Sequence, residues 1–435
     1  MKQMKIVVIG GGSSYTPELL QGIIDNYSTL PVNQLVLVDI KEGENKVKIN
    51  ARFLRRIIEK QGLPIEVEYT LNRREALKGA DFIVTQLRVG GLAARALDEK
   101  IPLKYDVIGQ ETTGPGGFLK ALRTIPVILD LCKDIEEVCP DAWLINFTNP
   151  AGIITEAVSN HTNVKVIGLC NVPINMKYEV AERLKVSPER INCTFVGLNH
   201  LSYINHIYLD GKDIIDEVLQ VYSRTQSESV VKNISKIDDM DKFTGILGLI
   251  PSPYLQYFYF ENKMLNEEKE NMEKGIGTRA EQVMKVEKNL FEIYESEITE
   301  IPEELSKRGG SRYSEVAINL INSIWNNTGD LHVVNVMNKG SIVDLPYDCV
   351  IESNCIVNNQ GATPISNGYL PENISGLVKQ VKIYEQLTIE AAVKGDRNKA
   401  LLALVNNPLV SNIDKAESIL AELLEAHKKY LPRFY

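Results

Sequence analysis

The feature that most constrains this fold is the alternation of short apolar runs with helical stretches over residues 5–170. Runs such as "KIVVIG", "QLVLVD" and "DFIVTQL" alternate with segments whose apolar residues have helical spacing. Short buried strands separated by helices are typical of a parallel sheet with crossover helices. "AWLINFT" and "VKVIGLC" continue the pattern, and the latter is expected to be the last parallel strand. The first part of the chain is therefore predicted to be an α/β, Rossmann-like doubly wound sheet.

The pattern changes near residue 190. "NCTFVGL", "SYINHIYLDG" and "HVVNVMNKGSIVDL" alternate apolar and polar residues, with Asp210-Gly211 and Lys339-Gly340 as candidate turns. These segments predict one antiparallel layer, accompanied by amphipathic helices. At 435 residues the chain is long enough for two domains. We expect a Rossmann-like domain over residues 1–190 and an α+β domain over 191–435, with the polar stretch 223–241 as a mobile loop.

Charge and cysteine usage exclude several classes of partner. The chain has 48 basic and 57 acidic side chains, a net charge of −9, and no run of Lys or Arg. Nucleic acid and membrane surfaces are therefore not expected partners. Six cysteines without a CxxC pair indicate a reduced chain without disulfides. No signal peptide and no apolar run of about 18 residues is found, so we expect a cytoplasmic protein.

A glycine-rich turn follows the first predicted strand. "VVIGGGSSYTPEL" places Gly10, Gly12 and Ser13 between a strand and a helix, where backbone amides can receive a pyrophosphate. An ordinary tight strand-to-helix turn is the alternative. Asp39 ends the second strand, where a carboxylate can bind the adenosine ribose. Together these residues predict dinucleotide binding and favour NAD over NADP.

Two further strand ends carry possible metal ligands. Cys170 and His200 each follow an apolar run, and thiolate and imidazole are common ligands of transition metals. Taken singly, such a cysteine is more often a small buried hydrophobe than a ligand, and such a histidine is more often a satisfied core residue. Asn149 lies at the end of another strand, in "INFTNPAG", where ligand binding and a simple Asn-Pro turn remain open.

Other polar residues stand in glycine- or proline-rich contexts. Arg95 and Glu111 belong to a glycine-rich segment that could cover a cofactor or form a surface loop. Tyr254 follows a Pro-Ser-Pro break, which suits a residue displayed from a loop. Arg279 begins a helix after "GIGT", so helix amides and a guanidinium could bind an anion there. A solvated helix start is the alternative for Arg279.

Several of these stretches together resemble one enzyme family. "IGGGSSYTPEL", "IGQETTGPGGF", "NFTNPAG", "GLCNVP", "GLNHLS" and "YLQYFYF…GTRAE" occur in the order of the NAD- and Mn²⁺-dependent glycosidases of glycoside hydrolase family 4. The resemblance runs from about Lys5 to the last helix. It implies a fold like that of lactate and malate dehydrogenases, with NAD and Mn²⁺ or another divalent metal as cofactors. Asn171 and Pro173 match the members that act on β-linked sugars, so the resemblance implies hydrolysis of 6-phospho-β-glucosides.

The chemistry implied by the resemblance is a redox-assisted elimination. NAD⁺ oxidises C3 of the sugar, a base removes the acidified C2 proton, the aglycone leaves C1, water adds, and the hydride returns. The implied site residues are Cys170 and His200 for the metal, Tyr254 as the base and Glu111 as the acidic residue that raises its basicity. Gly10, Gly12, Ser13 and Asp39 are implied for NAD, and Arg95, Asn149, Asn171 and Arg279 for the substrate.

Three other functions remain open at this stage. A 6-phospho-α-glucosidase would belong to the same family. A malate or 2-hydroxyacid dehydrogenase-like oxidoreductase would share fold and cofactor but pair a histidine with an aspartate, without metal. A non-catalytic NAD-binding regulator would bind the cofactor without turnover. Apolar helices in the second half predict a homodimer or homotetramer.

Overall fold

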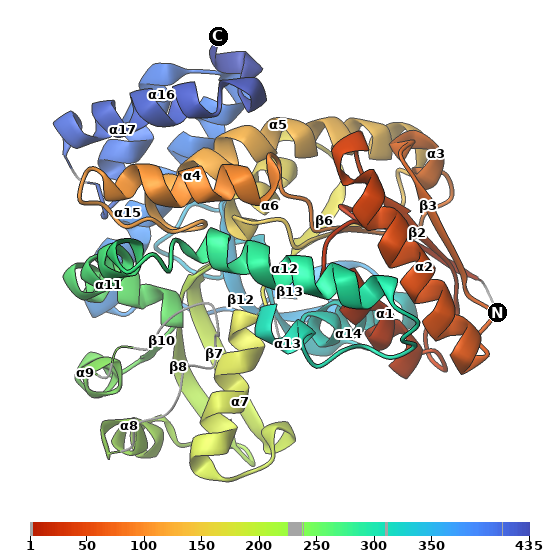
Figure 1. Ribbon diagram of the computed structural model, residues 1–435. Coiled ribbons are helices and arrows are strands. Elements are labelled where there is room, and N and C mark those ends of the chain that lie inside the picture. Colours follow the sequence, from red (N-terminus) through yellow and green to blue (C-terminus); the bar gives the residue numbers. More distant parts are fainter. Residues whose placement is uncertain (1–2, 225–236, 238, 309–311, 411) are drawn as a thin grey trace.

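The computed structural model describes residues 3–224, 237, 239–308, 312–410 and 412–435 (Figure 1). Most of the stretch predicted as a mobile loop, 223–241, lies outside the described residues, so that prediction is not tested. Among the described residues, no helix has both the length and the apolar run needed to cross a bilayer.

The N-terminal half is built on six parallel strands. They are β1 (Met4–Ile9), β2 (Val32–Val38), β3 (Glu66–Thr70), β4 (Phe82–Thr85), β5 (Trp143–Asn146) and β6 (Lys165–Gly168). Their spatial order is β6-β5-β4-β1-β2-β3, which is the strand order of a Rossmann fold. The connecting helices are α1 (Thr16–Asp25), α2 (Glu44–Gln61), α3 (Arg73–Leu77), α4 (Gly91–Leu103), α5 (Gly114–Val138) and α6 (Ala151–His161). The predicted doubly wound sheet is confirmed.

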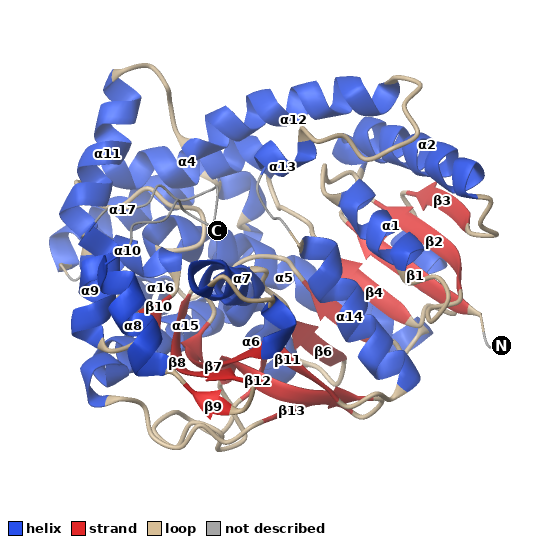
Figure 2. Cartoon of the chain, turned by 90° about the horizontal axis from the view of Figure 1, so that it is seen from below, coloured by secondary structure: helices blue, strands red, loops and turns tan. Residues whose placement is uncertain are grey.

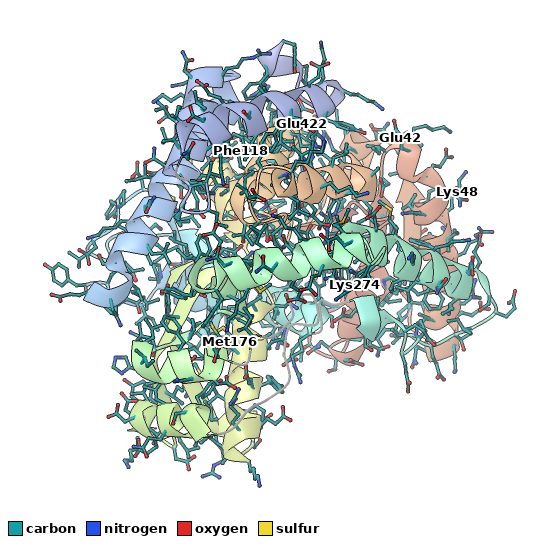
Figure 3. All side chains as sticks on the ribbon, turned by 60° about the vertical axis from the view of Figure 1, so that its left-hand side comes forward. Glu42, Lys48, Phe118, Met176, Lys274 and Glu422 are labelled. Carbon is teal, nitrogen blue, oxygen red and sulfur yellow. The ribbon has the colours of Figure 1, made fainter. Side chains whose placement is uncertain are left out.

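Both faces of this sheet are buried, as the continuous apolar runs require. Along β1, Val7 and Ile9 belong to a core that includes α5, whereas Ile6 and Val8 belong to a second core under α1 and α2. Figure 2 shows helices on both sides of the strands. Phe118 of α5, labelled in Figure 3, is fully buried.

Three C-terminal strands extend the same sheet. β11 (Asp330–Met337), β12 (Val350–Asn358) and β13 (Gly361–Pro364) add to the edge at β6 in antiparallel orientation. The alternating pattern predicts this segment in one layer with the strands after residue 190, and this prediction is wrong. An alternating pattern identifies the buried face of a strand, but it does not identify the neighbouring strand. Here β11 covers the edge of β6, whose backbone groups would otherwise be unpaired.

A second, smaller sheet contains β7 (Ile191–Leu198), β8 (Leu201–Leu209), β9 (Lys212–Asp213) and β10 (Ile250–Pro251). Asp210 and Gly211 have φ values of 50° and 85° and form the predicted turn between β8 and β9. The β7–β8 hairpin closes through two residues, Asn199 and His200, because Leu198 pairs with Leu201. His200 has a φ of 62°, an uncommon value for a residue with a side chain.

The remaining helices surround these two sheets (Figure 1). They are α7 (Val172–Leu184), α8 (Ile215–Arg224), α9 (Asp239–Leu247), α10 (Gln256–Tyr259), α11 (Glu261–Glu273), α12 (Arg279–Glu295), α13 (Leu305–Arg308), α14 (Tyr313–Asn326), α15 (Glu372–Lys394), α16 (Arg397–Asn406) and α17 (Ile413–Ala426).

A buried ion-pair cluster connects α15 to the sheet. Lys382 on α15 contacts Glu156 of α6 at 2.7 Å and Glu385 at 2.5 Å, and Glu156 also accepts the Val350 N–H of β12 at 2.7 Å.

We expect Lys382→Met to lower the free energy of unfolding by about 3–5 kcal/mol, because it leaves two buried carboxyl groups without their cation. The control is Lys379→Met on the same helix, whose partner Asp344 lies at the surface, and it should cost about 1 kcal/mol or less. Urea unfolding followed by circular dichroism measures both variants. Equal losses would show that the buried cluster contributes no more than a surface pair.

Candidate active site

The glycine-rich turn after β1 forms a tight cradle. Gly10 has a φ of 87°, and a Cβ on Gly10 would lie 2.8 Å from the Cα of Leu87. A Cβ on Gly12 would lie 2.7 Å from Oδ2 of Asp39. Side chains at either position would collide with fixed groups, so the turn depends on glycine. The N-terminus of α1 follows directly, which fits a pyrophosphate.

Asp39 and Ser13 complete the cradle. The Gly12 N–H donates to Oδ2 of Asp39 at 2.7 Å, and the Ile40 N–H donates to Oδ1 at 2.8 Å. Each carboxylate oxygen keeps a second lone pair that could accept a ribose hydroxyl. Burial raises the pKa of Asp39. Ser13 Oγ accepts the N–H of Tyr15 at 3.3 Å, so the four residues predicted for NAD lie in one place.

Cys170, His200 and Tyr254 converge where the two sheets meet. Cys170 lies two residues beyond β6, and its Sγ accepts the Val172 N–H at 3.5 Å. The rings of His200 and Tyr254 stack with centroids 3.8 Å apart and planes 3° apart. The charge of the Cys170 thiolate raises the pKa of Tyr254, which places the sulfur close to the same ring. All three side chains are buried.

The donor set fits a metal with open coordination positions. Burial lowers the pKa of His200 to about 3, so the imidazole is neutral, as metal ligation requires. Burial, together with the charge of Glu352, raises the pKa of Cys170 to about 12, so a cation is needed to stabilise the thiolate. No group of three or more His, Cys, Asp or Glu side chains in the described part of the chain could hold a metal ion. A metal at Cys170 and His200 would therefore keep positions free for substrate oxygens.

Glu111 is the centre of a buried charge cluster. It contacts Arg95 at 3.1 Å, Lys120 at 3.0 Å and Arg88. Burial opposes ionisation, but these three cations hold the pKa of Glu111 well below its usual value. Burial lowers the pKa of Lys120 to about 7, despite its contact with Glu111. A carboxylate thus stays ionised in a buried site, beside an amine that can exchange a proton near neutral pH.

Tyr254 has a higher pKa than an exposed tyrosine in this environment. Burial is the main cause, and the negative charges of Glu111 and Cys170 raise the pKa further. Arg95 and a hydrogen bond with Thr112 act in the opposite direction. Without an additional cation, the Tyr254 hydroxyl therefore keeps its proton at neutral pH.

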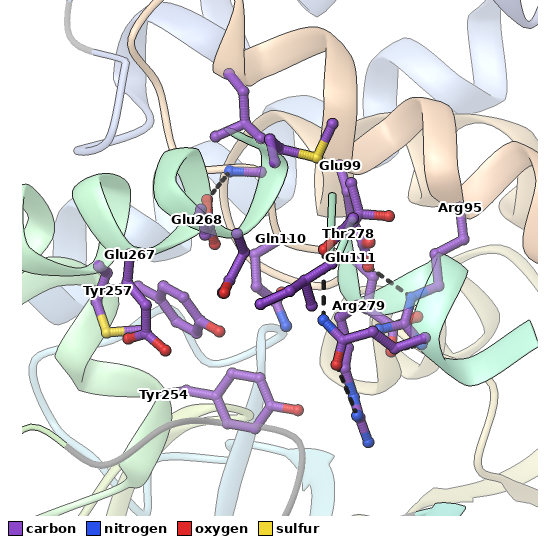
Figure 4. Close-up of a pocket in the computed structure, with 18 residues that line it drawn as sticks. Arg95, Glu99, Gln110, Glu111, Tyr254, Tyr257, Glu267, Glu268, Thr278 and Arg279 are labelled. Carbon is purple, nitrogen blue, oxygen red and sulfur yellow. Dashed lines mark hydrogen bonds and ion pairs between the residues drawn. The ribbon is translucent and has the colours of Figure 1, made fainter. Parts of the chain in front are cut away.

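Four of the predicted site residues line one pocket of about 310 Å³ (Figure 4). They are Arg95, Glu111, Tyr254 and Arg279. In Figure 4 the Tyr254 hydroxyl points toward the side of the pocket that carries Arg279. Glu99 and Glu268 also line this pocket. Burial raises the pKa of Glu268 to about 8, and its carboxyl accepts the Gly109 N–H at 2.8 Å.

The start of α12 differs from the sequence expectation in one respect. We expected helix amides to be available to an anion beside Arg279, but the Ala280 N–H donates to Glu99 at 2.7 Å. The Glu281 N–H donates to Thr278 Oγ1 at 3.4 Å within a capping box. Of these groups, the guanidinium of Arg279 is therefore the one directed to the pocket.

The two predicted asparagines lie at helix starts near the strand ends. Asn149 accepts the Ala151 N–H at 3.3 Å with Oδ1 at the start of α6. Asn171 is the residue before α7, next to Cys170. Neither is among the residues that line the 310 Å³ pocket, and the same holds for Cys170 and His200.

Sequence reasoning missed Glu99, Lys120 and Glu352. Glu99 bridges Arg95, at 2.6 Å, to α12, and Glu352 is a buried carboxyl on β12. Glu352 did carry a signal, since an acidic residue in the middle of the apolar run "DCVIESNCIV" has to be satisfied internally. Lys120 and Glu99 are ordinary helix residues in sequence, and only the fold brings them to Glu111 and Arg95.

Comparisons with known proteins identify the family that the chain resembles. The model of the Family 4 glycosyl hydrolase matches residues 5–186, and that of the Family 4 glycosyl hydrolase C-terminal domain matches residues 195–410. A probable 6-phospho-beta-glucosidase of Bacillus subtilis (strain 168) is 51% identical over 436 residues, covering 100% of this chain and 98% of that protein. The 6-phospho-beta-glucosidase of Escherichia coli (strain K12) is 44% identical over 438 residues, covering 100% and 97%.

Solved structures extend the likeness to the fold. The 6-phospho-beta glucosidase from Thermotoga maritima, with manganese, NAD⁺ and glucose-6-phosphate, matches with a TM-score of 0.89 and 39% identity, covering 98% of this chain and 99% of that one. A malate dehydrogenase from Plasmodium falciparum matches with a TM-score of 0.53 at 14% identity, covering 92% and 99%. The predicted dehydrogenase-like fold is thereby confirmed. Because two family models span most of its length and full-length relatives share up to half of its residues, the chain belongs to glycoside hydrolase family 4.

Proposed function

We propose that this chain is a 6-phospho-β-glucosidase that releases glucose 6-phosphate and an aglycone, with NAD and a divalent metal such as Mn²⁺ as cofactors. The observation that carries the proposal is the stack of Tyr254 on His200, with Tyr254 in the pocket that also holds Arg95 and Arg279. Three relatives named as 6-phospho-β-glucosidases are 40–51% identical, against 29–33% for five relatives named as phospho-α-glucosidases or maltose-6'-phosphate glucosidases. Asn171 and Pro173 support the β-type.

Cys170 and His200 are the proposed metal ligands, and Gly10, Gly12, Ser13 and Asp39 the proposed NAD contacts. Bound NAD would supply the acceptor and donor of a hydride at C3 of the sugar, and a bound metal would withdraw electron density from the sugar oxygens. In this scheme the neutral imidazole of His200 is ready to bind without losing a proton. Cys170 would have to lose its proton to act as a ligand.

Tyr254 is the proposed base for the C2 proton. Its raised pKa means that the hydroxyl needs a nearby positive charge to ionise, and the adjacent Cys170–His200 pair is where such a charge would be held. Glu111 keeps its negative charge beside Tyr254 and makes the phenolate a stronger base. Lys120, with a pKa of about 7, is suited to accept the proton that Tyr254 loses when the phenolate forms.

Arg279 is the proposed contact of the 6-phosphate, since a guanidinium can donate two parallel hydrogen bonds to a phosphate. Arg95 is the proposed sugar contact within the same pocket. Asn149 and Asn171 are proposed to contact the sugar from the neighbouring strand end, with Asn171 beside the metal.

We further propose that residues 1–190 act as the NAD-binding domain and residues 191–435 as the substrate, metal and oligomerisation domain. The glycine cradle in the first range and Arg279 in the second support this division.

Exposed apolar side chains support a homodimer or homotetramer, with Val343 52%, Tyr347 69% and Tyr369 72% exposed. A cytoplasmic location is part of the same proposal.

The purified protein should cleave a chromogenic 6-phospho-β-glucoside when NAD⁺, Mn²⁺ and a reductant are present, while total NADH stays constant. The hydride is borrowed and returned, so no net reduction of the cofactor is expected. Release of the chromophore and absorbance at the NADH wavelength are followed together. Stoichiometric NADH formation from a hydroxy acid, or turnover of α-linked substrates alone, would contradict the proposal.

Arg279→Ala should raise KM for the phosphorylated substrate at least 10-fold, because a charge-assisted hydrogen bond to the phosphate is lost. The dissociation constant of NAD⁺, measured by calorimetry, should change less than twofold. Lys288→Ala, a change at an exposed residue of the same helix, is the control and should leave both constants unchanged. An equal rise of KM in both variants would indicate a general effect of the charge of α12.

The KM of the phosphorylated substrate should rise about three- to tenfold between pH 7 and pH 9. The raised pKa of Glu268, about 8, means that its carboxyl is neutral at pH 7 and becomes negative as pH increases, which repels the phosphate in the same pocket. The second phosphate pKa lies near 6, so the substrate charge is constant over this range. Glu268→Gln should flatten the profile, whereas Glu270→Gln on the exposed side of α11 should not. A wild-type profile that is already flat would contradict this assignment.

A further inference from the structure

The two proposed metal ligands have to be held at a fixed separation by the protein. Cys170 follows β6 of the nine-stranded sheet, and His200 lies in a hairpin of the second sheet. With only two protein ligands, the metal cannot itself enforce the geometry that four ligands would impose. In addition, His200 has a φ of 62°, which costs about 1 kcal/mol or more for a residue with a side chain. Such a conformation persists only where neighbouring contacts determine it.

Glu352 supplies these contacts from β12. Its Oε1 accepts the side-chain amide of Asn199 at 2.9 Å, on the N-terminal side of His200. Its Oε2 accepts the hydroxyl of Ser202 at 2.7 Å, on the C-terminal side. The carboxyl group of Glu352 therefore binds the hairpin on both sides of His200.

The same carboxyl is connected to the strand that leads to Cys170. Asn335 of β11 is the register partner of Glu352 on one side and of Gly168 on the other. The Asn335 side-chain amide donates to Oε1 of Glu352 at 3.3 Å. Gly168 is two residues before Cys170. The neighbouring positions on β6, β11 and β12 therefore connect the strand end that carries Cys170 to the carboxyl group of Glu352.

Close packing leaves the side chains of Asn335 and Asn199 little freedom. A Cβ on Gly168 would lie 2.2 Å from Thr155 Oγ1 and 2.9 Å from the Cβ of Asn335. A Cβ on Gly152 would lie 3.2 Å from the Cβ of Asn199. Both amides are thus held against glycine backbone as well as against the carboxyl.

Nothing in the fold itself requires a carboxyl at this position. Glu352 is 1% exposed, and the side chains that bind its carboxyl group among the described residues are the neutral ones of Asn199, Ser202 and Asn335. Burying a carboxyl group with only neutral partners is costly. A cost of this kind is often retained at a functional site.

We propose that Glu352 is a positioning residue that presets the His200 hairpin relative to Cys170, so that the two ligands are in place before the metal binds. This inference rests on the proposed function in taking Cys170 and His200 as the ligands. Glu352 contacts neither the substrate nor the metal in this scheme; it acts through Asn199, Ser202 and Asn335.

Glu352→Ala should weaken Mn²⁺ binding 10- to 100-fold, the usual range for the loss of an outer contact that orients a ligand. Free Mn²⁺ is measured by its electron paramagnetic resonance signal during titration of the full-length protein with NAD⁺ present. The affinity for NAD⁺ itself should change less than twofold. Glu352→Gln should stay within about threefold of the wild type, because its carbonyl can accept from the two asparagines and its amide can donate to Ser202.

Asn354→Ala is the matched control. Asn354 lies on the same strand and also connects β12 to β7, by accepting the Phe195 N–H at 2.7 Å and donating to the Cys193 carbonyl at 2.9 Å. It is remote from the hairpin turn, so its removal should lower the melting temperature without changing Mn²⁺ affinity. Ser202→Ala is a milder test, with an expected loss of about threefold in Mn²⁺ affinity, in case Glu352→Ala does not fold.

The outcomes separate the inference from the proposed function. Cys170→Ser should abolish Mn²⁺ binding; if it does not, the ligand assignment itself is wrong. If Cys170→Ser abolishes binding while Glu352→Ala and Ser202→Ala bind Mn²⁺ like the wild type, the positioning role alone is overturned. The role is also overturned if Asn354→Ala weakens Mn²⁺ as much as Glu352→Ala, or if Glu352→Gln loses as much as Glu352→Ala, which would point to charge rather than position.

Discussion

Burial of both faces of the parallel sheet is the constraint on which the rest of the structure depends. With helices over each face, the strands carry apolar side chains in both directions, and polar chemistry is confined to the strand ends. The glycine cradle follows β1, Asp39 follows β2 and Cys170 follows β6. The second sheet brings His200 to the same region. The site is thus assembled at the ends of strands and not on the faces of the sheet.

A second consequence of burial is that charges at the site are balanced within the protein. Glu111 is surrounded by Arg88, Arg95 and Lys120, and burial pushes the pKa values of Lys120 and His200 downward. Lys120, which would be permanently charged in water, can therefore lose or gain a proton near neutral pH, whereas His200 stays neutral and Glu111 stays ionised. In a reaction that moves protons and a hydride in turn, an amine that titrates near neutral pH is more useful than a fixed charge.

Much of the first half was predictable because its signals are local. Each parallel strand is an apolar run whose end is marked in the sequence by the residues that follow it. The glycines of the cradle and Asp39 directly follow two of these ends. The neighbour of β6 was not predictable, because β11 reaches it from more than 160 residues away and only one register pair joins them. Glu99, Lys120 and Glu352 were missed for a related reason: their partners are set by tertiary packing. The αL conformation of His200 also left no mark in the sequence beyond the preceding Asn199.

The bridge made by Glu99 has a consequence for substrate selection. One of its oxygens binds Arg95 of α4 and the other binds the Ala280 N–H at the start of α12, so the two helices that carry the guanidinium groups are fastened together. The bridge then keeps the distance between Arg95 and Arg279 constant. Under the proposed function, a sugar would be accepted according to the distance between its ring hydroxyls and its phosphate, and a phosphate on another carbon would be rejected by length alone.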